Sequence, residues 1–451
     1  MELIQTVMDG ISRLGVSFML PVVVILLSLI LKISFGKALK SGLLIGAGFV
    51  GINLIVEMMN TGLGEAAAEM SRRFGLGLSV VDIGWQGAAP MAWASPIAAT
   101  AIPVAVLVNV AMVLLGLTRT VNIDIWNIWH MTFTGAIAYA ATGNLLVGIS
   151  GVAVHGAVSY KFGDLWAPYI EKYFELEGMT VPHGTSSYMA PVACAVELVI
   201  DRIPVLKDID FSAEKLQEKA GALAEPVVIG TILGSVIGIL AGYPIYDALP
   251  LGVEMGAVMV LMPKIVSFIM QGLTPLSQRI RDILSRHFGS EGISIGLDPS
   301  VLLGDPQVVA AGLLFIPLTL ILAVLVPGNR VLPFGDLATI SFFIAISVSV
   351  HHGNLFRTLI SGSIIMYVTI WIANQTIPWM NALSCITDTA SASGNVAALD
   401  QGGCPITYIY TQLFTRENIE GFLIIGIGYL LCIGAAVVCS GKEKENTDEM
   451  Q

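Results

Sequence analysis

The sequence predicts an all-α polytopic membrane protein with about 11 transmembrane helices and re-entrant hairpins between them. Hydrophobic residues make up 55% of the 451 residues, and charged residues make up only 12%. That charged share is about half of the share in soluble globular domains. Apolar runs of about 20 residues recur along the chain, and each is long enough to cross a bilayer as a helix.

The candidate spans begin near the N-terminus and continue almost to the end of the chain. In order, they are residues 14–33, 42–59, 96–117, 133–158, 186–202, 224–247, 249–270, 308–327, 331–350, 355–376 and 420–439. We expect the first to be a retained span rather than a signal peptide, because no small-residue cleavage site follows it. We expect residues 1–440 to form a single transport domain and residues 441–451 to form a polar, disordered tail.

The distribution of basic residues predicts the orientation of the chain in the membrane. Lys32, Lys37 and Lys40 follow the first apolar run, whereas Arg13 precedes it. The positive-inside rule then puts the N-terminus outside the cell and the first loop in the cytoplasm. An odd number of spans puts the C-terminus in the cytoplasm as well. The net charge of −11 adds little, because orientation depends on where the charges lie.

Four stretches between the spans are too polar for lipid and too rich in Gly and Pro for ordinary helices. They are residues 80–96, 179–191, 292–306 and 391–406. Non-helical backbone at membrane depth is tolerated where protein buries it or where it lines a water-filled cavity. The first and third stretches lie about 200 residues apart, and corresponding interruptions in two halves of a transporter point to a substrate site between the halves. No clear repeat of residues accompanies this spacing.

Common enzyme and metal motifs find no support. "GAGFVG" (46–51) matches a dinucleotide-binding pattern, but it lies inside an apolar span without a preceding strand. "GISIG" (292–296) matches a hydrolase elbow, but it leads into "LDPS" between membrane segments. The five cysteines show no CxxC or zinc spacing and are expected to pack as small apolar residues. We therefore expect no cofactor, no metal, no catalytic nucleophile and no nucleic-acid partner.

Ionisable residues near membrane depth are the stronger signal, because they are costly in lipid. Asp298 in "GLDPS" is a candidate acceptor for substrate hydroxyls, or a helix N-cap before Pro. Asp336 in "VLPFGDLATI" carries the same two interpretations. His130 follows Trp126 and Trp129, which makes it either part of a stacking surface with a donor or part of an interfacial aromatic anchor.

The stretch "FELEGMTVPHGTSSYMAP" (174–191) concentrates polar residues in the middle of the chain. Pro182 and Gly184 disfavour a continuous helix there. His183 and Thr185 could then face one cavity, a grouping that suits a neutral polyol. The alternative is an ordinary turn with an N-cap Thr. Glu175 and Glu177 are candidates for substrate contact or for a gate.

A further polar group lies in "VHHGNLFRT" (350–358). His352, Asn354 and Arg357 are candidates for substrate contact, for a cytoplasmic gate or for a partner contact.

Seven stretches of the sequence together resemble a known family. The stretches that carry the resemblance are "VVDIGWQGAAPMAWASPIA", "VNIDIWNIWHMTFTGA", "FELEGMTVPHGTSSYM", "IGLDPSVLLG", "VPGNRVLPFGDLATI", "GNLFRTLISG" and "LDQGGCPIT". They look like the signature stretches of galactitol-type enzyme IIC, the membrane subunit of a bacterial phosphoenolpyruvate-dependent sugar phosphotransferase system. The ascorbate-specific IIC is a more distant likeness.

The resemblance implies a homodimer in the bacterial inner membrane, with a scaffold domain and a core domain that moves like an elevator. A galactitol-like polyol would be phosphorylated by a separate IIB subunit, which IIA supplies, and the chain itself would accept no phosphoryl group. Its share of the reaction would be to position the substrate hydroxyl. Carried over by position, the resemblance points to Gln86, His130, His183 and Asp298 as substrate contacts. Gln86 and Cys404 depart from the family pattern, so the preferred polyol could differ from galactitol.

A second class of function is compatible with the same residues. In an ion-coupled secondary transporter of a polar solute, Asp298, Asp336 and Glu175 would serve protons or Na⁺. A membrane hydrolase is a distant third interpretation.

Overall fold

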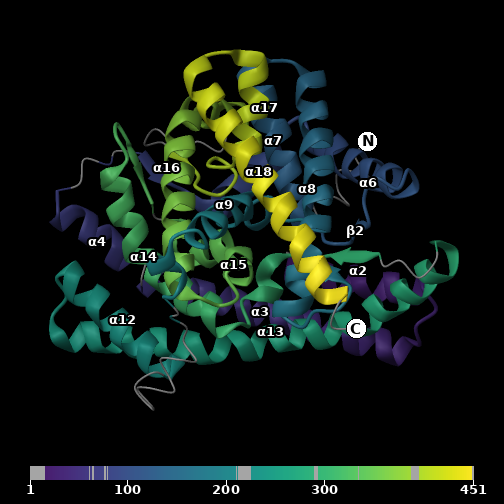
Figure 1. The fold of residues 1–451 in the computed structure, drawn as a ribbon, viewed down its shortest axis with the longest axis horizontal. Helices are drawn as coiled ribbons and strands as arrows, with labels where there is room; N and C mark the ends of the chain where they lie inside the picture. The colour runs from purple at the N-terminus through teal and green to yellow at the C-terminus, as the bar shows by residue number, and fades with distance from the viewer. Residues whose placement is uncertain are drawn as a thin grey trace.

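The protein is helical (Figure 1), with two very small parallel sheets of three strands each. The computed structural model describes residues 16–448 except for residues 60, 63–64, 76–77, 79, 210, 212–224, 289–292, 334 and 388–395. The helical class is confirmed. The sheets correct the expectation of a purely α structure, because the polar stretches between the helices pair with one another as short strands.

The elements fall into two halves along the chain. The described elements of the first half are α2 (Val16–Ile30), α3 (Phe35–Met59), α4 (Glu65–Arg73), β1 (Val80–Asp82), α5 (Gly84–Ala94), α6 (Ala98–Leu114), β2 (Thr120–Asn122), α7 (Ile125–Thr142), α8 (Leu145–Tyr173), β3 (Met179–Thr180), α9 (Ser186–Ile200) and α10 (Pro204–Lys207). Those of the second half are α12 (Pro226–Ala241), α13 (Ile245–Phe288), β4 (Ser294–Gly296), η3 (Pro299–Leu302), α14 (Pro306–Leu325), β5 (Val331–Leu332), η4 (Leu337–Thr339), α15 (Ile340–Val350), α16 (Leu355–Ile386), β6 (Val396–Ala397), α17 (Pro405–Thr415) and α18 (Ile419–Asp448).

Four described helices are long and apolar enough to cross a membrane, namely α8, α14, α16 and the part of α18 from Ile419 to Glu443. A fifth span is possible if the bent pair Gly87–Trp93 and Ala98–Leu114 counts as one, with an angle of 91° between its parts. The chain leaves the helical conformation at Ser95, before Pro96, which explains the bend. The structure thus confirms a helical membrane protein but does not confirm a count of eleven spans.

Three expected segments differ from the structure. The span expected over residues 331–350 begins as the strand β5, and its α-helix α15 starts only at Ile340. The single span expected over residues 133–158 is broken, because Gly143 adopts φ 67° and ends α7. Asn144 then caps α8 by accepting from the N–H groups of Leu146 and Val147. The tail that was expected to be disordered is helical as far as Asp448, because α18 continues through its Lys and Glu residues, which favour helix.

The two sheets exchange strands between the halves of the chain. The first sheet has the order β5-β1-β6, and the second has the order β2-β4-β3. All described pairings are parallel. The opening strand of each half therefore lies between the second and third strands of the other half. This places the polar stretches 80–96 and 292–306 in equivalent positions, as their spacing predicts.

The register makes the equivalence specific. In the first sheet Ala397 lies opposite Asp82, the last residue of the central strand. In the second sheet Thr180 lies opposite Gly296, which is again the last residue of the central strand. The segments that leave β6 and β3 consequently start from matching points.

Outside the sheets, the opening hairpins of the two halves pack on each other. Helix α2 contacts α3, α3 contacts α13, and α13 contacts α12. Helix α13 runs along the lower edge of the view in Figure 1, with α3 beside it. The remaining helices surround the sheets. The largest buried side chains there include Trp166, Tyr188, Phe315 and Phe343.

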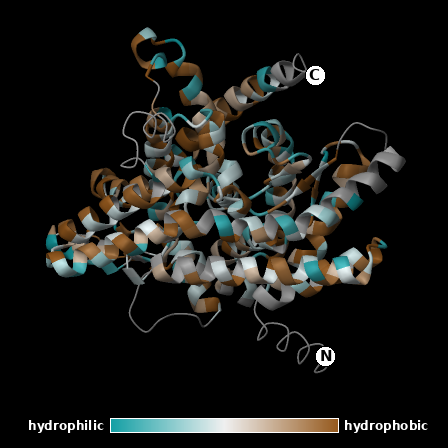
Figure 2. Cartoon of the chain, turned by 90° about the horizontal axis from the view of Figure 1, so that it is seen from below, coloured by the Kyte–Doolittle hydropathy of each residue, from teal (hydrophilic) through white to brown (hydrophobic). Residues whose placement is uncertain are grey.

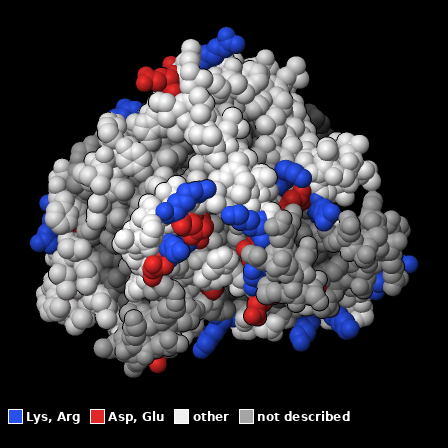
Figure 3. Space-filling view, viewed as in Figure 1, with Lys and Arg blue, Asp and Glu red and all other residues white. Residues whose placement is uncertain are grey.

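The surface agrees with a membrane environment. Hydrophobic residues recur along most helices (Figure 2). On α18, Leu430 and Leu431 are 68% and 72% exposed, which would be costly in water for a row of such residues. Among the residues that Figure 3 draws in white, blue or red, large areas are uncharged, and Lys, Arg, Asp and Glu gather at the top and across the lower half.

Candidate functional site

The candidate site lies where the short strands end. Each described strand ends in, or is followed within a few residues by, a buried or nearly buried Asp or His: Asp82, Asp124, His183, Asp298, Asp336 and Asp400. Because the strands of each sheet are parallel, their carboxyl ends meet at one edge, which is where ligands bind in open parallel sheets.

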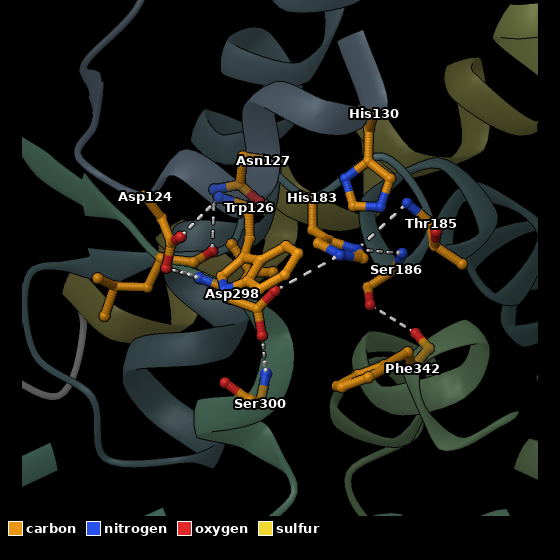
Figure 4. A network of polar contacts seen from close by, with 12 residues as sticks. Asp124, Trp126, Asn127, His130, His183, Thr185, Ser186, Asp298, Ser300 and Phe342 are labelled. Atoms are coloured by element: carbon orange, nitrogen blue, oxygen red, sulfur yellow. Dashed lines mark hydrogen bonds and ion pairs between the residues drawn. The ribbon is translucent and has the colours of Figure 1, made fainter. Parts of the chain in front are cut away.

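His183 follows β3 and is held in one tautomer. Its Nδ1 accepts from the backbone N–H groups of Thr185 at 3.2 Å and Ser186 at 3.4 Å. Burial lowers the pKa of His183 well below its usual value, so the imidazole is neutral. The single ring proton therefore sits on Nε2, which lies 3.6 Å from Oδ2 of Asp298 (Figure 4).

Asp298 caps a helical turn and also presents a carboxylate oxygen to His183. Its Oδ1 accepts from the N–H of Ser300 at 2.8 Å at the start of η3, and its Oδ2 faces His183. The helix N-cap interpretation is therefore confirmed, and contact with a substrate hydroxyl stays a prediction.

Asp124 stands behind Asp298 and was not singled out from the sequence. It caps α7 through the N–H of Trp126 at 2.9 Å, and it accepts from the N–H of Asp298 at 3.2 Å (Figure 4). Burial, and then the neighbouring charge of Asp298, raise the pKa of Asp124 to about 7. Burial raises the pKa of Asp298 as well.

His130 comes from α7 and stacks against His183. The two ring centroids are 4.1 Å apart, in a T-shaped arrangement, and both residues are buried. Neither ring nitrogen of His130 makes a hydrogen bond within the described residues. The neighbouring Trp129 is only 3% exposed, so this pair belongs to the interior and is not an interfacial anchor.

Asp400 is the main site residue that the sequence did not single out. Its Oδ1 accepts from the hydroxyl of Thr185 and from Nε2 of Gln401, and its Oδ2 lies 3.7 Å from Nε2 of His130. Burial alone would raise the pKa of Asp400, but His130, Thr185 and Gln401 hold it below its usual value. The sequence signal for Asp400 was its place within the polar, Gly-containing stretch "LDQGGCPI".

Gly184 allows the histidines to approach. A Cβ added there would lie 2.7 Å from Cβ of His130 and 2.9 Å from Nε2 of His155, which is closer than real side chains come. His155 is buried and its Nδ1 lies 2.7 Å from the hydroxyl of Thr134. Cys404 packs from the other side, with its Sγ 3.7 Å from the carbonyl oxygen of Gly184.

Comparison with known proteins identifies the family. A family described as "PTS system sugar-specific permease component" matches residues 10–402. The chain belongs to this family.

Curated relatives of this permease family cover nearly the whole chain. The galactitol-specific EIIC component of the PTS system of Escherichia coli (strain K12) is 53% identical over 424 residues, which is 94% of each chain. The protein of the same name from Escherichia coli O157:H7 matches equally. A putative permease IIC component of Escherichia coli (strain K12) is 37% identical over 439 residues, which is 97% of this chain and 99% of that protein.

The structure brings together four of the residues predicted for this phosphotransferase-system permease. His130, His183, Thr185 and Asp298 form one connected group. Gln86 lies in the first turn of α5, and its side chain lies outside the described part of the structure. Glu175 and Glu177 are exposed between α8 and β3 and make no described contact with the histidine pair.

Asp336 has a supporting position in the permease. Its Oδ1 accepts from the N–H of Trp85 at 2.9 Å, and its Oδ2 accepts from the N–H of Asp400 at 2.7 Å. Its own N–H donates to Oδ2 of Asp82 at 2.9 Å. Asp336 therefore ties the first sheet to the site through the backbone.

The residues from 351 to 357 form a separate cluster. Arg357 pairs with Glu197 and, at 2.9 Å, with Asp201, and the buried His351 also contacts Glu197. Asn354 caps α16 and donates to the carbonyl of Ile209 at 2.8 Å. His352 is 57% exposed. The cluster fastens the segment after α9 to the start of α16.

Proposed function

We propose that this chain binds galactitol or a closely related polyol, carries it across the bacterial inner membrane and presents it to a separate phosphorylated IIB subunit. The observation that supports this most is the group of two stacked imidazoles, each facing one carboxylate. Such a group offers hydroxyl donors and acceptors in a buried setting, and it rejects analogues that lack the hydroxyls. The relative at 53% identity is named galactitol-specific.

The division into halves supports an elevator-type permease. The α2–α3 and α12–α13 hairpins pack together and would form the scaffold. The elements around the two sheets would form the core that moves with the substrate. In this proposal the protein is a homodimer with about 11 spans, N-terminus outside and C-terminus in the cytoplasm.

The alternative of an ion-coupled transporter is less well supported. Asp298, Asp336 and Glu175 differ in what they contact. Asp336 holds backbone N–H groups, Glu175 is exposed, and only Asp298 reaches the histidine pair. No described contact links the three carboxylates.

Uptake by membrane vesicles tests the proposal. Vesicles that contain the chain should accumulate labelled galactitol only when phosphoenolpyruvate and the IIA and IIB subunits are supplied, and the product inside should be phosphorylated. A screen of hexitols and pentitols by thermal stabilisation of the purified protein would identify the preferred polyol. Accumulation of unmodified galactitol driven by a pH gradient alone would contradict the proposal and favour the ion-coupled alternative.

A further inference from the structure

The site contains two imidazole–carboxylate gaps of nearly the same width. Nε2 of His183 lies 3.6 Å from Oδ2 of Asp298, and Nε2 of His130 lies 3.7 Å from Oδ2 of Asp400. Both separations are too long for a direct hydrogen bond. An oxygen atom placed beside each pair can reach both atoms at about 2.8 Å. A hydroxyl there would donate a hydrogen bond to the carboxylate. It would also accept a hydrogen bond from the imidazole if the facing nitrogen carries a proton, and Nε2 of His183 does.

The two gaps occupy equivalent places in the two halves. Thr180 and Ala397 lie opposite the last residues of the two central strands, and His183 and Asp400 each follow three residues later. Each gap also joins the halves: His183 meets a carboxylate from the second half, and Asp400 meets an imidazole from the first. The two gaps thus have matching positions but exchanged residue types. The residue that follows β3 is an imidazole, His183, whereas the residue that follows β6 is a carboxylate, Asp400.

Polar groups on the Asp400 side are left without partners. Both ring nitrogens of His130 and Oε1 of Gln401 are buried and make no hydrogen bond within the described residues. Such groups normally find a partner, so each calls for a ligand or water. Gln401 also adopts φ 51°, a conformation that only a few per cent of non-glycine residues take.

Contacts with neighbouring residues hold Asp400 so that its Oδ2 is open to accept a hydrogen bond. Thr185 and Gln401 occupy its Oδ1, and the N–H of Asp400 is fixed by Asp336. Its side chain is 10% exposed, whereas that of His130 is fully buried. A ligand would therefore reach the open Oδ2 and the edge of the imidazole from one side.

We propose that Asp400 is a substrate-binding residue, and that it and His130 hold a different hydroxyl of the same polyol from the one held by Asp298 and His183. This inference rests on the proposed function. The two imidazoles are in contact, with their centroids 4.1 Å apart, so hydroxyls of one polyol chain can lie at both gaps. Two binding points of this kind select polyols over ligands with a single hydroxyl.

Calorimetry with deoxygenated ligands tests the assignment. Binding of galactitol and of a panel of monodeoxygalactitols is measured for the wild type, Asp400→Asn and Asp298→Asn. Each variant should bind galactitol about 10- to 100-fold more weakly, because a hydrogen bond to a charged acceptor is lost. For the one analogue that lacks the hydroxyl held at the altered residue, variant and wild type should bind alike. The analogue that binds like this should be a different compound for Asp400→Asn than for Asp298→Asn.

Asp305→Asn is the matched control. Asp305 caps α14 by accepting from the N–H groups of Gln307 and Val308, and Asn serves as well at such a position. This variant should bind every ligand as the wild type does.

The outcomes separate the two proposals. A wild type that binds no hexitol contradicts the proposed function and this inference with it. A wild type that binds galactitol and an Asp400→Asn variant that binds it equally well overturn this inference alone. This inference alone is also overturned if Asp400→Asn and Asp298→Asn both match the wild type in affinity for the same monodeoxygalactitol, because the two residues would then hold the same hydroxyl. If Asp400→Asn does not fold, Asp400→Glu keeps the charge but moves the carboxylate into the gap, and wild-type binding by that variant would overturn the inference.

Discussion

The backbone N–H of Asp400 donates a hydrogen bond to Oδ2 of Asp336 at 2.7 Å, so one buried carboxylate fixes the position of another. Asp336 also accepts from Trp85 and so connects α5, the first sheet and the site. Its effect on a ligand would pass through the backbone of Asp400.

Replacing Asp336 with Ala should therefore lower both stability and affinity. Two buried N–H groups lose their acceptor, at a cost of about 1–3 kcal/mol each. We expect a lower melting temperature and weaker galactitol binding together, measured by thermal unfolding and calorimetry on the same preparation. An Asp336→Ala protein with normal stability and abolished binding would instead place Asp336 in direct contact with the substrate.

Asp298→Asn and His183→Ala should each weaken galactitol binding about 10- to 100-fold while the protein still folds. The first removes the open acceptor of one gap, and the second removes the neutral donor opposite it. Calorimetry should show the loss of affinity, and size-exclusion chromatography should show an unchanged profile. Wild-type affinity in both variants would refute the site.

Gly184→Ala should impair the site through packing alone. The added Cβ would lie 2.7 Å from Cβ of His130, and overpacking of this kind costs about 1–3 kcal/mol. We expect the two imidazoles to move apart and galactitol affinity to fall. Gly426→Ala on α18 is the control, since nothing lies within 4 Å of a Cβ there. Equal binding by the two variants would show that the close approach of His130 is not needed.

Galactitol affinity should fall as the pH is lowered from neutral. Only the ionised form of Asp298 accepts a hydroxyl proton at both oxygens, and burial raises its pKa, so protonation begins at a higher pH than for an exposed Asp. Burial raises the pKa of Asp124 to about 7, so this carboxyl is already largely protonated when Asp298 titrates at lower pH. Asp124→Asn should therefore leave the midpoint of the affinity loss unchanged. Calorimetry across pH measures the midpoint, with melting temperatures at each pH to exclude unfolding.

Arg357→Ala should destabilise the protein without changing galactitol affinity. Arg357 is only 12% exposed and pairs with Glu197, which also contacts His351. Loss of one partner of a buried pair costs about 3 kcal/mol or more. Arg72→Ala, which breaks an exposed pair with Glu69, should cost about 1 kcal/mol or less. A large loss of affinity in Arg357→Ala would return Arg357 to the substrate site.

The sequence predicted the helical membrane class and the family because these depend on local composition and on motifs. It singled out His130, His183, Thr185 and Asp298, which the structure brings together, since each lies in a polar break that is unusual for its surroundings. It did not single out Asp400, because that residue faces a histidine 270 positions earlier in the chain. It also left Asp336 ambiguous, because a buried Asp that binds backbone looks the same in sequence as one that binds substrate.

The short strands were missed for a similar reason. β3, β5 and β6 have two residues each, too few for alternation of polar and apolar residues to show. Their pairing is set by contact between the halves and not by local propensity. The break at Gly143 was missed because the apolar run continues across it, although Gly followed by Asn is a helix end signal.

The exchange of strands between the halves also determines when the first sheet can assemble during synthesis. β1 pairs with strands that lie about 250 and 315 positions later, so the first sheet stays open until β6 has left the ribosome. Long-range pairings of this kind form late and slowly, and an unpaired β1 could meanwhile join the later strands of a neighbouring chain. A nascent protein truncated before Val396 should therefore insert its helices yet remain a target for quality-control proteases.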